Sequence, residues 1–539
     1  MKRIVAGLGA LAATLWLAAS ASAQVETDWI ARYDGPPSQD DWPYAIDVDT
    51  AGNVYVAGTV NDPSTVADYA TLKYDADGNL LWAVLYDGPV SGLDEANDVG
   101  VDLEGNVYVT GLSTGSGTQA DWATLKYDAA GTFVWERREN NFVANGEDVA
   151  NALEVDEAGN IYVTGRYTAW HMGFPGYTSL EFMTVKYDPD GNAIWLRTFD
   201  GGGDDEALAL DVDALGNVYV TGWSQGVGRD YLTVKYSTDG TLLWSQSYNG
   251  PGNLDDTPRD LVVDDAGNVF VTGYCQVNLN NTDYATTKYD PSGTPLWTRL
   301  YNGPGGWHDW AEAVGVDTGG NAFVAGTSDG NSSQYDYATL KYDPAGTLLW
   351  ERRFDDVFAH GWDFASALDV DASGNVYVTG WSTVWHPGIP VELTEDYRTI
   401  KYDPDGGADW SLIYNGPGNK RDEPTDILVD RRGNVYVTGM SPGVAATFYY
   451  DFATIKYSQC FCPCHGDPQC DSVANVQDVV QTVNVAFRGS APAFDPNCPR
   501  ERTDVNCDGF STVQDVVKVV NVAFRGANPT TEFCDPCAP

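Results

Sequence analysis

Basic residues are scarce in this chain of 539 residues. Thirty Lys and Arg stand against 77 Asp and Glu, which gives a formal net charge of −47. So acidic a surface repels phosphate groups, which makes nucleic acids and anionic membranes poor partners. Cations, cationic polymers and neutral glycans remain compatible with it. The simplest reason for the charge is solubility outside the cell.

Long hydrophobic runs are also missing. The main apolar stretch, residues 4–19, follows Lys2 and Arg3 and precedes Ala21-Ser22-Ala23, the pattern of a secretory signal peptide cleaved after Ala23. It is too short to span a bilayer, and no later segment is long and apolar enough to do so. We therefore expect residues 1–23 to be removed. The mature chain is then secreted or held at the surface of a bacterial cell, with no membrane span.

Cysteine is nearly absent from the first 459 residues, where Cys275 stands alone. The other eight cysteines lie between Cys460 and Cys537. In an exported chain so dense a cluster indicates disulfide bonds, and the change in composition indicates a domain boundary. The sequence thus predicts a signal peptide at residues 1–23, a large domain at residues 24–458 and a cysteine-rich module at residues 459–539.

The large domain contains one sequence unit that is repeated eight times. Its clearest marker is the run Gly-Asn-Val-Tyr-Val-Thr-Gly, which begins, with small changes, at Gly52, Gly105, Gly159, Gly216, Gly267, Gly320, Gly374 and Gly433. A period of about 50 residues, built only from alternating, strand-like segments, is typical of a β-propeller. We predict an all-β fold, an eight-bladed β-propeller of four-stranded blades.

The links within each unit differ in kind. Two are tight turns of the Asp-x-x-Gly type, and two vary in length and sequence, so the variable links gather on one face, where function is expected. The segment Trp29–Tyr33 has no unit of its own and is predicted to close the last blade. Trp29 and Trp244 illustrate a longer period of 215 residues. Two four-bladed rings are therefore an alternative, but one ring is favoured because no linker separates the halves.

Two stretches carry a family resemblance. They are Val-Asp-x-x-Gly-Asn-Val-Tyr-Val-Thr-Gly and Lys-Tyr-Asp-x-x-Gly-x-x-x-Trp, and they resemble the SBBP-type bacterial β-propeller repeat over about four fifths of the chain. That resemblance implies a propeller and an exported context, but no agreed chemistry. The Asp-x-x-Gly-x-x-x-Trp spacing is also similar to the tryptophan-docking repeats of quinoprotein dehydrogenases. A quinoprotein-like oxidoreductase is therefore kept as an alternative.

Two repeated features resemble functional motifs. Gly-x-Ser-x-Gly, the nucleophile elbow of hydrolases, occurs in four units, the first at Gly111–Gly115. No helical pattern follows it and four elbows in one ring have no mechanism, so we expect structural serines and assign no catalytic residue. The eight repeated tryptophans are expected to pack between blades. They are Trp29, Trp82, Trp135, Trp195, Trp244, Trp297, Trp350 and Trp410.

Aromatic residues outside the repeat pattern are better candidates for ligand contact. Units three and seven share a long insertion, which contains a Trp-His pair in each copy. We predict that a glycan or protein ligand contacts residues of the variable face, namely Trp170, His171, Trp385, His386, Trp307 and Trp310. Trp42 and Trp362 are further exposed candidates. A cluster of convergent acids at the channel mouth would instead indicate a carbohydrate-active enzyme.

Calcium loops are predicted in the cysteine-rich module. The segment 504–515 places Asp, Asn and Asp at positions 1, 3 and 5, Gly at 6 and Asp at 12, and a similar segment starts 37 residues earlier. An amphipathic helix follows each loop. The expected Ca²⁺ ligands are Asp504, Asn506, Asp508, Phe510, Thr512 and Asp515, with Asp467, Gln469, Asp471, Val473, Asn475 and Asp478 in the first loop.

The duplicated loop and helix, each copy ending in Asn-Val-Ala-Phe-Arg-Gly, resemble the type I dockerin module. The resemblance implies a small α-helical, calcium-binding module that docks to a cohesin-like or cell-surface protein partner. Gln469, Ser472 and the loop cysteines Cys470 and Cys507 depart from the usual pattern. We therefore expect an exported, non-enzymatic binding or scaffold protein. The alternative is a polysaccharide-degrading enzyme, since dockerins often accompany such enzymes.

Overall fold

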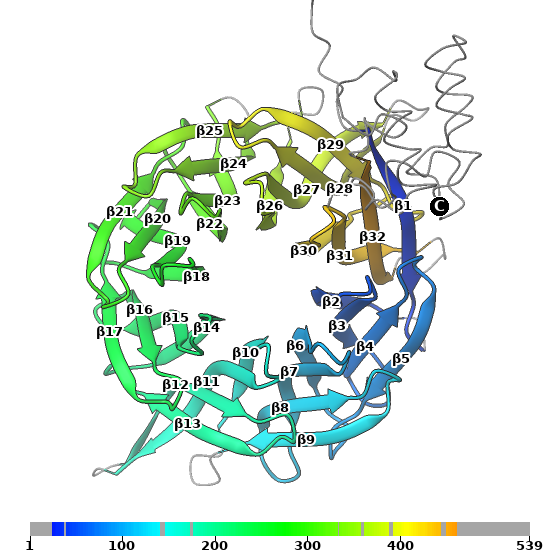
Figure 1. Cartoon of the computed structure of the whole chain (residues 1–539), viewed down its shortest axis with the longest axis vertical. Helices are drawn as coiled ribbons and strands as arrows, with labels where there is room; N and C mark the ends of the chain where they lie inside the picture. Colours follow the sequence, from blue (N-terminus) through cyan, green and yellow to red (C-terminus); the bar gives the residue numbers. More distant parts are fainter. Residues whose placement is uncertain are drawn as a thin grey trace, which may run out of the picture. The chain divides into compact units, whose positions relative to one another are not determined.

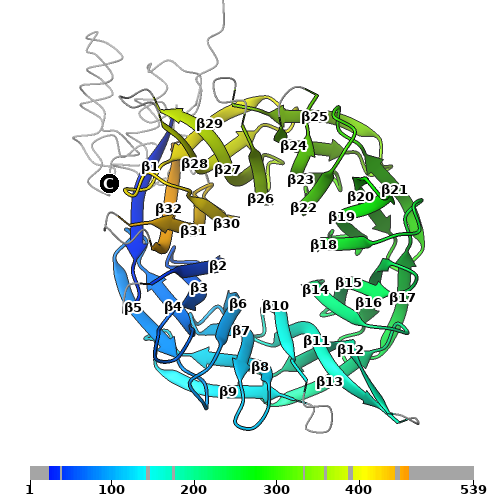
Figure 2. The same cartoon turned by 180° about the vertical axis from the view of Figure 1, so that it is seen from behind.

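The structure is a computed structural model that describes residues 24–36, 39–140, 146–172, 176–331, 334–356, 361–386, 392–443 and 449–460. The described secondary structure consists of 32 strands, without a helix among these residues. The strands form eight four-stranded antiparallel sheets around one axis (Figure 1, and Figure 2 from behind). The prediction of an all-β, eight-bladed propeller is confirmed.

Each blade is an antiparallel meander. Its first strand lies nearest the axis of the ring and its last strand lies at the rim. Blades 1 to 4 consist of β2 (Asp41–Val48), β3 (Val54–Val60), β4 (Asp68–Tyr74), β5 (Leu80–Tyr86); β6 (Asp94–Val101), β7 (Val107–Thr114), β8 (Ala120–Tyr127), β9 (Phe133–Glu139); β10 (Val149–Val155), β11 (Ile161–His171), β12 (Tyr177–Tyr187), β13 (Ala193–Phe199); and β14 (Asp205–Val212), β15 (Val218–Gln225), β16 (Arg229–Tyr236), β17 (Leu242–Tyr248).

Blades 5 to 8 continue the ring in the same way. They consist of β18 (Asp256–Val263), β19 (Val269–Asn278), β20 (Asn281–Tyr289), β21 (Pro295–Tyr301); β22 (Asp309–Val316), β23 (Ala322–Asp329), β24 (Tyr335–Tyr342), β25 (Leu348–Phe354); β26 (Asp363–Val370), β27 (Val376–His386), β28 (Glu392–Tyr402), β29 (Ala408–Tyr414); and β30 (Glu423–Val429), β31 (Val435–Pro442), β32 (Tyr450–Cys460) with β1 (Gln24–Tyr33).

The chain closes the ring by joining its two ends in blade 8. The strand order there is β1-β32-β31-β30, so the N-terminal strand is the rim strand of the last blade, as predicted. Arg32 of β1 donates to Asp451 Oδ2 of β32 at 2.8 Å and to the Ser441 carbonyl of β31 at 2.7 Å. Blade 4 also packs directly on blade 5 through β14 and β18. The alternative of two four-bladed rings is therefore wrong.

The Asp-x-x-Gly turns are held by a fixed set of hydrogen bonds. In blade 2, Asp102 Oδ1 accepts from the backbone N–H groups of Glu104 and Asn106 at 3.0 and 2.8 Å, and Asp102 Oδ2 accepts from the Tyr108 hydroxyl at 2.9 Å. Gly105 has φ of +80°, which a side chain would strain. The repeated motif is thus the set of residues that one such turn requires.

The repeated tryptophans join neighbouring blades at the turn between the third and fourth strands. Trp135 of blade 2 donates from Nε1 to the Pro189 carbonyl in the β12–β13 turn of blade 3 at 3.2 Å. Its ring lies against Gly191, where a Cβ atom would come within 2.8 Å of it. The same bond recurs at Trp29, Trp82, Trp195, Trp244, Trp297 and Trp350. The predicted packing between blades is confirmed.

Contacts group residues 25–458 into one compact unit. The predicted signal peptide and both predicted calcium loops lie outside the described residues. Among those residues, no helix is long and apolar enough to cross a membrane.

Candidate functional site

The face opposite the Asp-x-x-Gly turns carries the variable links, and we call it the variable face. The longest hairpins on it are β11–β12 in blade 3 and β27–β28 in blade 7, which lie in opposite blades (Figure 1). Trp170 and Trp385 are about half exposed near the hairpin ends, at 45% and 41%. The structure therefore places these two predicted contact residues in solvent, but on separate sides of the ring.

The histidines of the two hairpins turn toward acids of their own blade. His171 Nε2 lies 2.6 Å from Ser179 Oγ and 3.3 Å from Glu181 Oε1, and its ring stacks on Tyr177. In blade 7, His386 Nε2 lies 2.8 Å from Asp396 Oδ2. Each predicted Trp-His pair is thus divided between a solvent-facing tryptophan and a histidine held by a carboxylate.

A continuous row of rings crosses blades 6 and 7. His308 stacks on Trp310 with ring centres 5.5 Å apart, and Trp310 lies 5.2 Å from Tyr335. Tyr335 contacts Phe364 of the next blade at 5.4 Å, and Phe364 stacks on Trp381 at 4.7 Å. The row ends beneath the guanidinium of Arg421, 4.8 Å above the Trp381 ring.

A cavity of about 550 Å³ opens beside this aromatic row. Its walls include Trp307, His308, Asp329, Tyr335 and Trp362. Trp307 and Trp362 are 59% and 48% exposed, which is unusual for such large apolar rings. Burial raises the pKa of the Asp329 carboxyl above its usual range. The cavity therefore combines two open aromatic surfaces with an acid and an imidazole.

The sequence predicts only part of this site. Trp307, Trp310 and Trp362 are predicted ligand contacts because they lie outside the repeat pattern. The prediction does not group them with Tyr335, Phe364 or Trp381. The repeats differ at one position that indicates this grouping. Blade 2 has Glu95 at the second position of its innermost strand, whereas blades 6 and 7 have the aromatic residues Trp310 and Phe364 there. Comparing the eight units position by position would have exposed this change.

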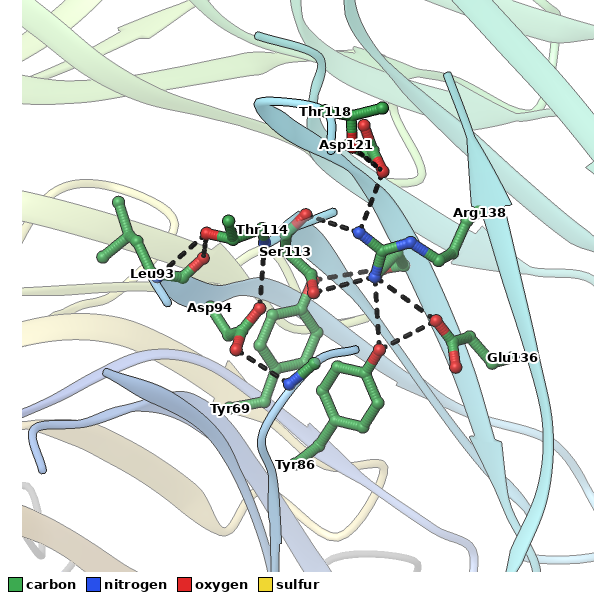
Figure 3. A network of polar contacts seen from close by, with 12 residues as sticks. Tyr69, Tyr86, Leu93, Asp94, Ser113, Thr114, Thr118, Asp121, Glu136 and Arg138 are labelled. Carbon is green, nitrogen blue, oxygen red and sulfur yellow. Dashed lines mark hydrogen bonds and ion pairs between the residues drawn. The ribbon is translucent and has the colours of Figure 1, made fainter. Parts of the chain in front are cut away.

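Among the described residues, the Gly-x-Ser-x-Gly serines of blades 2, 6 and 8 accept a hydrogen bond from an arginine of their own blade. Ser113 Oγ accepts from Arg138 Nη1 at 2.8 Å, and the same guanidinium bonds Asp121 and Glu136 (Figure 3). Ser328 Oγ accepts from Arg353 Nη1 at 2.6 Å in the same way. A serine that is part of an arginine network within its own blade has a structural task that explains the motif.

Aspartates on the inner strands clamp neighbouring blades around the axis. Asp98 Oδ2 of blade 2 accepts from the Leu153 N–H of blade 3 at 2.7 Å, and Asp260 of blade 5 bonds Val314 of blade 6 at 2.8 Å. Burial raises the pKa of both carboxyls to about 7. The same clamp is made by Asp47, Asp211, Asp369 and Asp426. These acids are thus part of the ring's framework.

Comparisons with known proteins agree with the fold. The beta-propeller repeat family named SBBP matches residues 28–62, 90–117, 243–280 and 409–443, which confirms that the chain carries this repeat. An uncharacterized WD repeat-containing protein, L264 of Acanthamoeba polyphaga mimivirus, is 24% identical over 246 residues, which cover 37% of this chain and 17% of that protein. The chain thus spans less than a fifth of the length of this relative.

Solved structures with a similar arrangement are distant in sequence. Sqt1 from Chaetomium thermophilum is 13% identical with a TM-score of 0.47, over 81% of this chain and 100% of that one. A protein of unknown function from Bacteroides caccae is 14% identical with a TM-score of 0.31, over 57% and 93% of the two chains.

Proposed function

We propose that this β-propeller repeat protein is a non-enzymatic binding protein whose variable face holds a glycan in the cavity of blades 6 and 7. The observation that carries the proposal is the pair of open tryptophans, Trp307 and Trp362, on the walls of one cavity. A sugar ring has apolar C–H faces that pack on aromatic rings and hydroxyls that need polar partners. Asp329 and His308 supply such partners in the same cavity.

Rigidity supports the proposal. Trp362 contacts Phe364 of the ring row at 6.5 Å, and Tyr335 is itself a member of that row, so these two side chains of the cavity are already ordered before a ligand arrives. Binding then costs little side-chain entropy. A neutral glycan also avoids repulsion by a chain with a net charge of −47.

A glycan-array screen of the full chain tests the proposal, followed by affinity measurement on the best glycan. The double variant Trp307→Ala and Trp362→Ala should weaken binding at least tenfold, because each stacking contact is worth about 0.5–1.5 kcal/mol beyond its buried area. The melting temperature should stay unchanged, since both side chains are exposed.

The matched control is Leu279→Ala. Leu279 is a large apolar residue of the variable face, 79% exposed, in the β19–β20 hairpin of blade 5. Its loss should leave glycan affinity as it was. Equal affinity of the double variant and the wild type would show that the cavity is not the glycan site.

For the cysteine-rich module the proposal comes from the sequence alone. We propose that residues 459–539 bind Ca²⁺ through the two loops and dock the exported protein to a cohesin-like or cell-surface partner. In the full chain, Asp504→Ala should remove more of the module's calcium affinity than Asp467→Ala, because the second loop has the more complete ligand set. Equal affinities would contradict this difference between the loops.

A further inference from the structure

The junctions between blades on the variable face gather acids at the same positions. The first strand of each blade starts at, or directly after, a fully buried aspartate such as Asp94 in blade 2 or Asp363 in blade 7. The third strand of the preceding blade contributes a second acid, such as Asp68 or Asp336. The link between the two blades adds Asp or Asn. Each junction therefore concentrates negative charge in a poorly hydrated place.

At two junctions three aspartates meet. Carboxylate oxygens of Asp68, Asp87 and Asp94 lie within 4.8 Å of one another between blades 1 and 2, and those of Asp336, Asp355 and Asp363 do so between blades 6 and 7. The first group forms because a bridge between Ala67 and Leu93 ties the two blades together directly beside the acids. Carboxylates this close repel each other unless a positive charge is present.

The junction of blades 6 and 7 contains its own positive charge. Arg353 Nη2 lies 2.7 Å from Asp336 Oδ2, and Arg398 of blade 7 lies 3.1 Å from Asp356 Oδ2 in the link. Arg398 also opposes the rise that burial causes in the pKa of Asp363. Two guanidinium groups therefore pair with acids at this junction.

At the junction of blades 1 and 2, no arginine occupies the position that corresponds to Arg353. Leu85 pairs with Ala70 where Arg353 pairs with Ala338, so blade 1 has an apolar residue at the arginine position. Within the described residues, no ion pair reaches Asp68, Asp87 or Asp94. The guanidinium of Arg138 in blade 2 is bound to Asp121, Glu136 and Ser113 (Figure 3).

A second observation points to a missing ligand. Asp68 is only 6% exposed, and its Oδ1 has no hydrogen-bond partner within the described chain. Burial raises the pKa of Asp68 to about 6; Asp87 and Asp94 add to the rise and the Thr65 hydroxyl opposes it. Yet Thr65 Oγ1 is itself buried without a hydrogen-bond partner among the described residues. Buried oxygens in this condition are costly, and a cation would satisfy them.

The other two acids are arranged to serve as ligands. Asp94 is oriented by the backbone N–H groups of Gly88 and Thr114, which lie 2.9 and 3.1 Å from its two oxygens, and by the Ser113 hydroxyl, and the carboxylate still has lone-pair capacity for a cation. Asp87 is exposed and bonds only weakly to the Ser91 hydroxyl, at 3.3 Å. We infer that Asp68, Asp87 and Asp94 bind a hard divalent cation of the Ca²⁺ type between blades 1 and 2, where no arginine pairs with Asp68.

Calcium binding by the full chain tests the inference, measured by equilibrium dialysis and by calorimetric titration. Asp87→Asn removes one ligand from an exposed position, so the chain should fold while binding one Ca²⁺ fewer, or binding it at least tenfold more weakly. The matched control is Asp355→Asn at the arginine-paired junction, which should leave the number of bound ions unchanged.

Leu85→Arg provides a second variant in which no ligand is removed. The new guanidinium should lie beside Asp68 as Arg353 lies beside Asp336, and should replace the cation. This variant should bind one Ca²⁺ fewer than the wild type and keep its melting temperature in chelator. If Asp87→Asn and Leu85→Arg both bind as many ions as the wild type with equal affinity, or if Asp355→Asn loses as much binding as Asp87→Asn, the inference is overturned.

Discussion

The two faces of the ring are built from the same eight repeats but follow different rules. On the turn face the turn between the third and fourth strands of a blade receives a tryptophan from the preceding blade, so a change there disturbs two blades at once. On the variable face the links between strands make fewer contacts that recur in every blade. They are free to differ, and there the chain exposes Trp307 and Trp362. The repeat therefore identifies structure, and departures from the repeat identify candidate function.

The two faces also differ in the state of their aspartates. Exposed turn aspartates such as Asp128 accept backbone N–H groups, which lower the pKa of the carboxyl. The axial clamps such as Asp98 are half-buried and the junction acid Asp68 is buried, and burial raises their pKa values. The charged form of an aspartate is thus stabilised on the turn face. It is destabilised near the axis and on the variable face.

The largest expected effect is on ring closure. Deleting residues 24–34 removes β1, with the bonds of Arg32 to blade 8 and the contact of Trp29 with the turn of blade 1. We expect β32 to be left as an open sheet edge, so that the protein melts far earlier and associates. Calorimetry and size-exclusion chromatography check this. A monomer that melts like the full chain would contradict the proposed role of β1.

A single turn-face residue should have the next largest effect. Trp135 is 7% exposed, so Trp135→Ala should lower the free energy of unfolding by about 3–5 kcal/mol. Denaturant unfolding followed by fluorescence measures the loss. The variable-face control Trp170→Ala, at a 45% exposed site, should change it by less than about 0.5 kcal/mol. Similar losses in the two variants would abolish the distinction between the faces.

The last expected effect is a dependence of the melting temperature on pH. The axial clamps Asp98 and Asp260 have pKa values of about 7 in the folded chain, against about 3.9 when unfolded. The folded state therefore binds more protons between these values, and stability falls as pH rises from about 5 to 8. The turn aspartates act in the opposite direction, and only below about pH 4.

Melting curves in chelator at pH 5, 6, 7 and 8 measure this dependence. Asp98→Asn with Asp260→Asn should make it shallower, because the amide keeps a hydrogen-bond acceptor but does not titrate. Asp128→Asn on the turn face is the control and should leave the slope between pH 5 and 8 as it was. A wild-type melting temperature that rises over this range would show that the clamps are not the controlling groups.

The repeat itself determined the number of blades, the four strands in each, the Asp-x-x-Gly turns, the tryptophan contacts and the closure by residues 29–33. These features could be predicted because each depends on residues close in sequence and recurs eight times, so one correct interpretation applies to all blades. The single ring, by contrast, was only favoured until the packing of β14 on β18 settled it.

Only the tertiary structure decided which non-repeated residues meet. Trp310, Tyr335, Phe364 and Trp381 come from four strands in two blades, and nothing in their spacing indicates that their rings form one row. Asp68 and Asp94 lie 26 residues apart and meet because the curvature of the ring brings the third strand of one blade to the first strand of the next. Contacts between blades depend on how sheets pack around an axis, and a linear pattern carries no record of that packing.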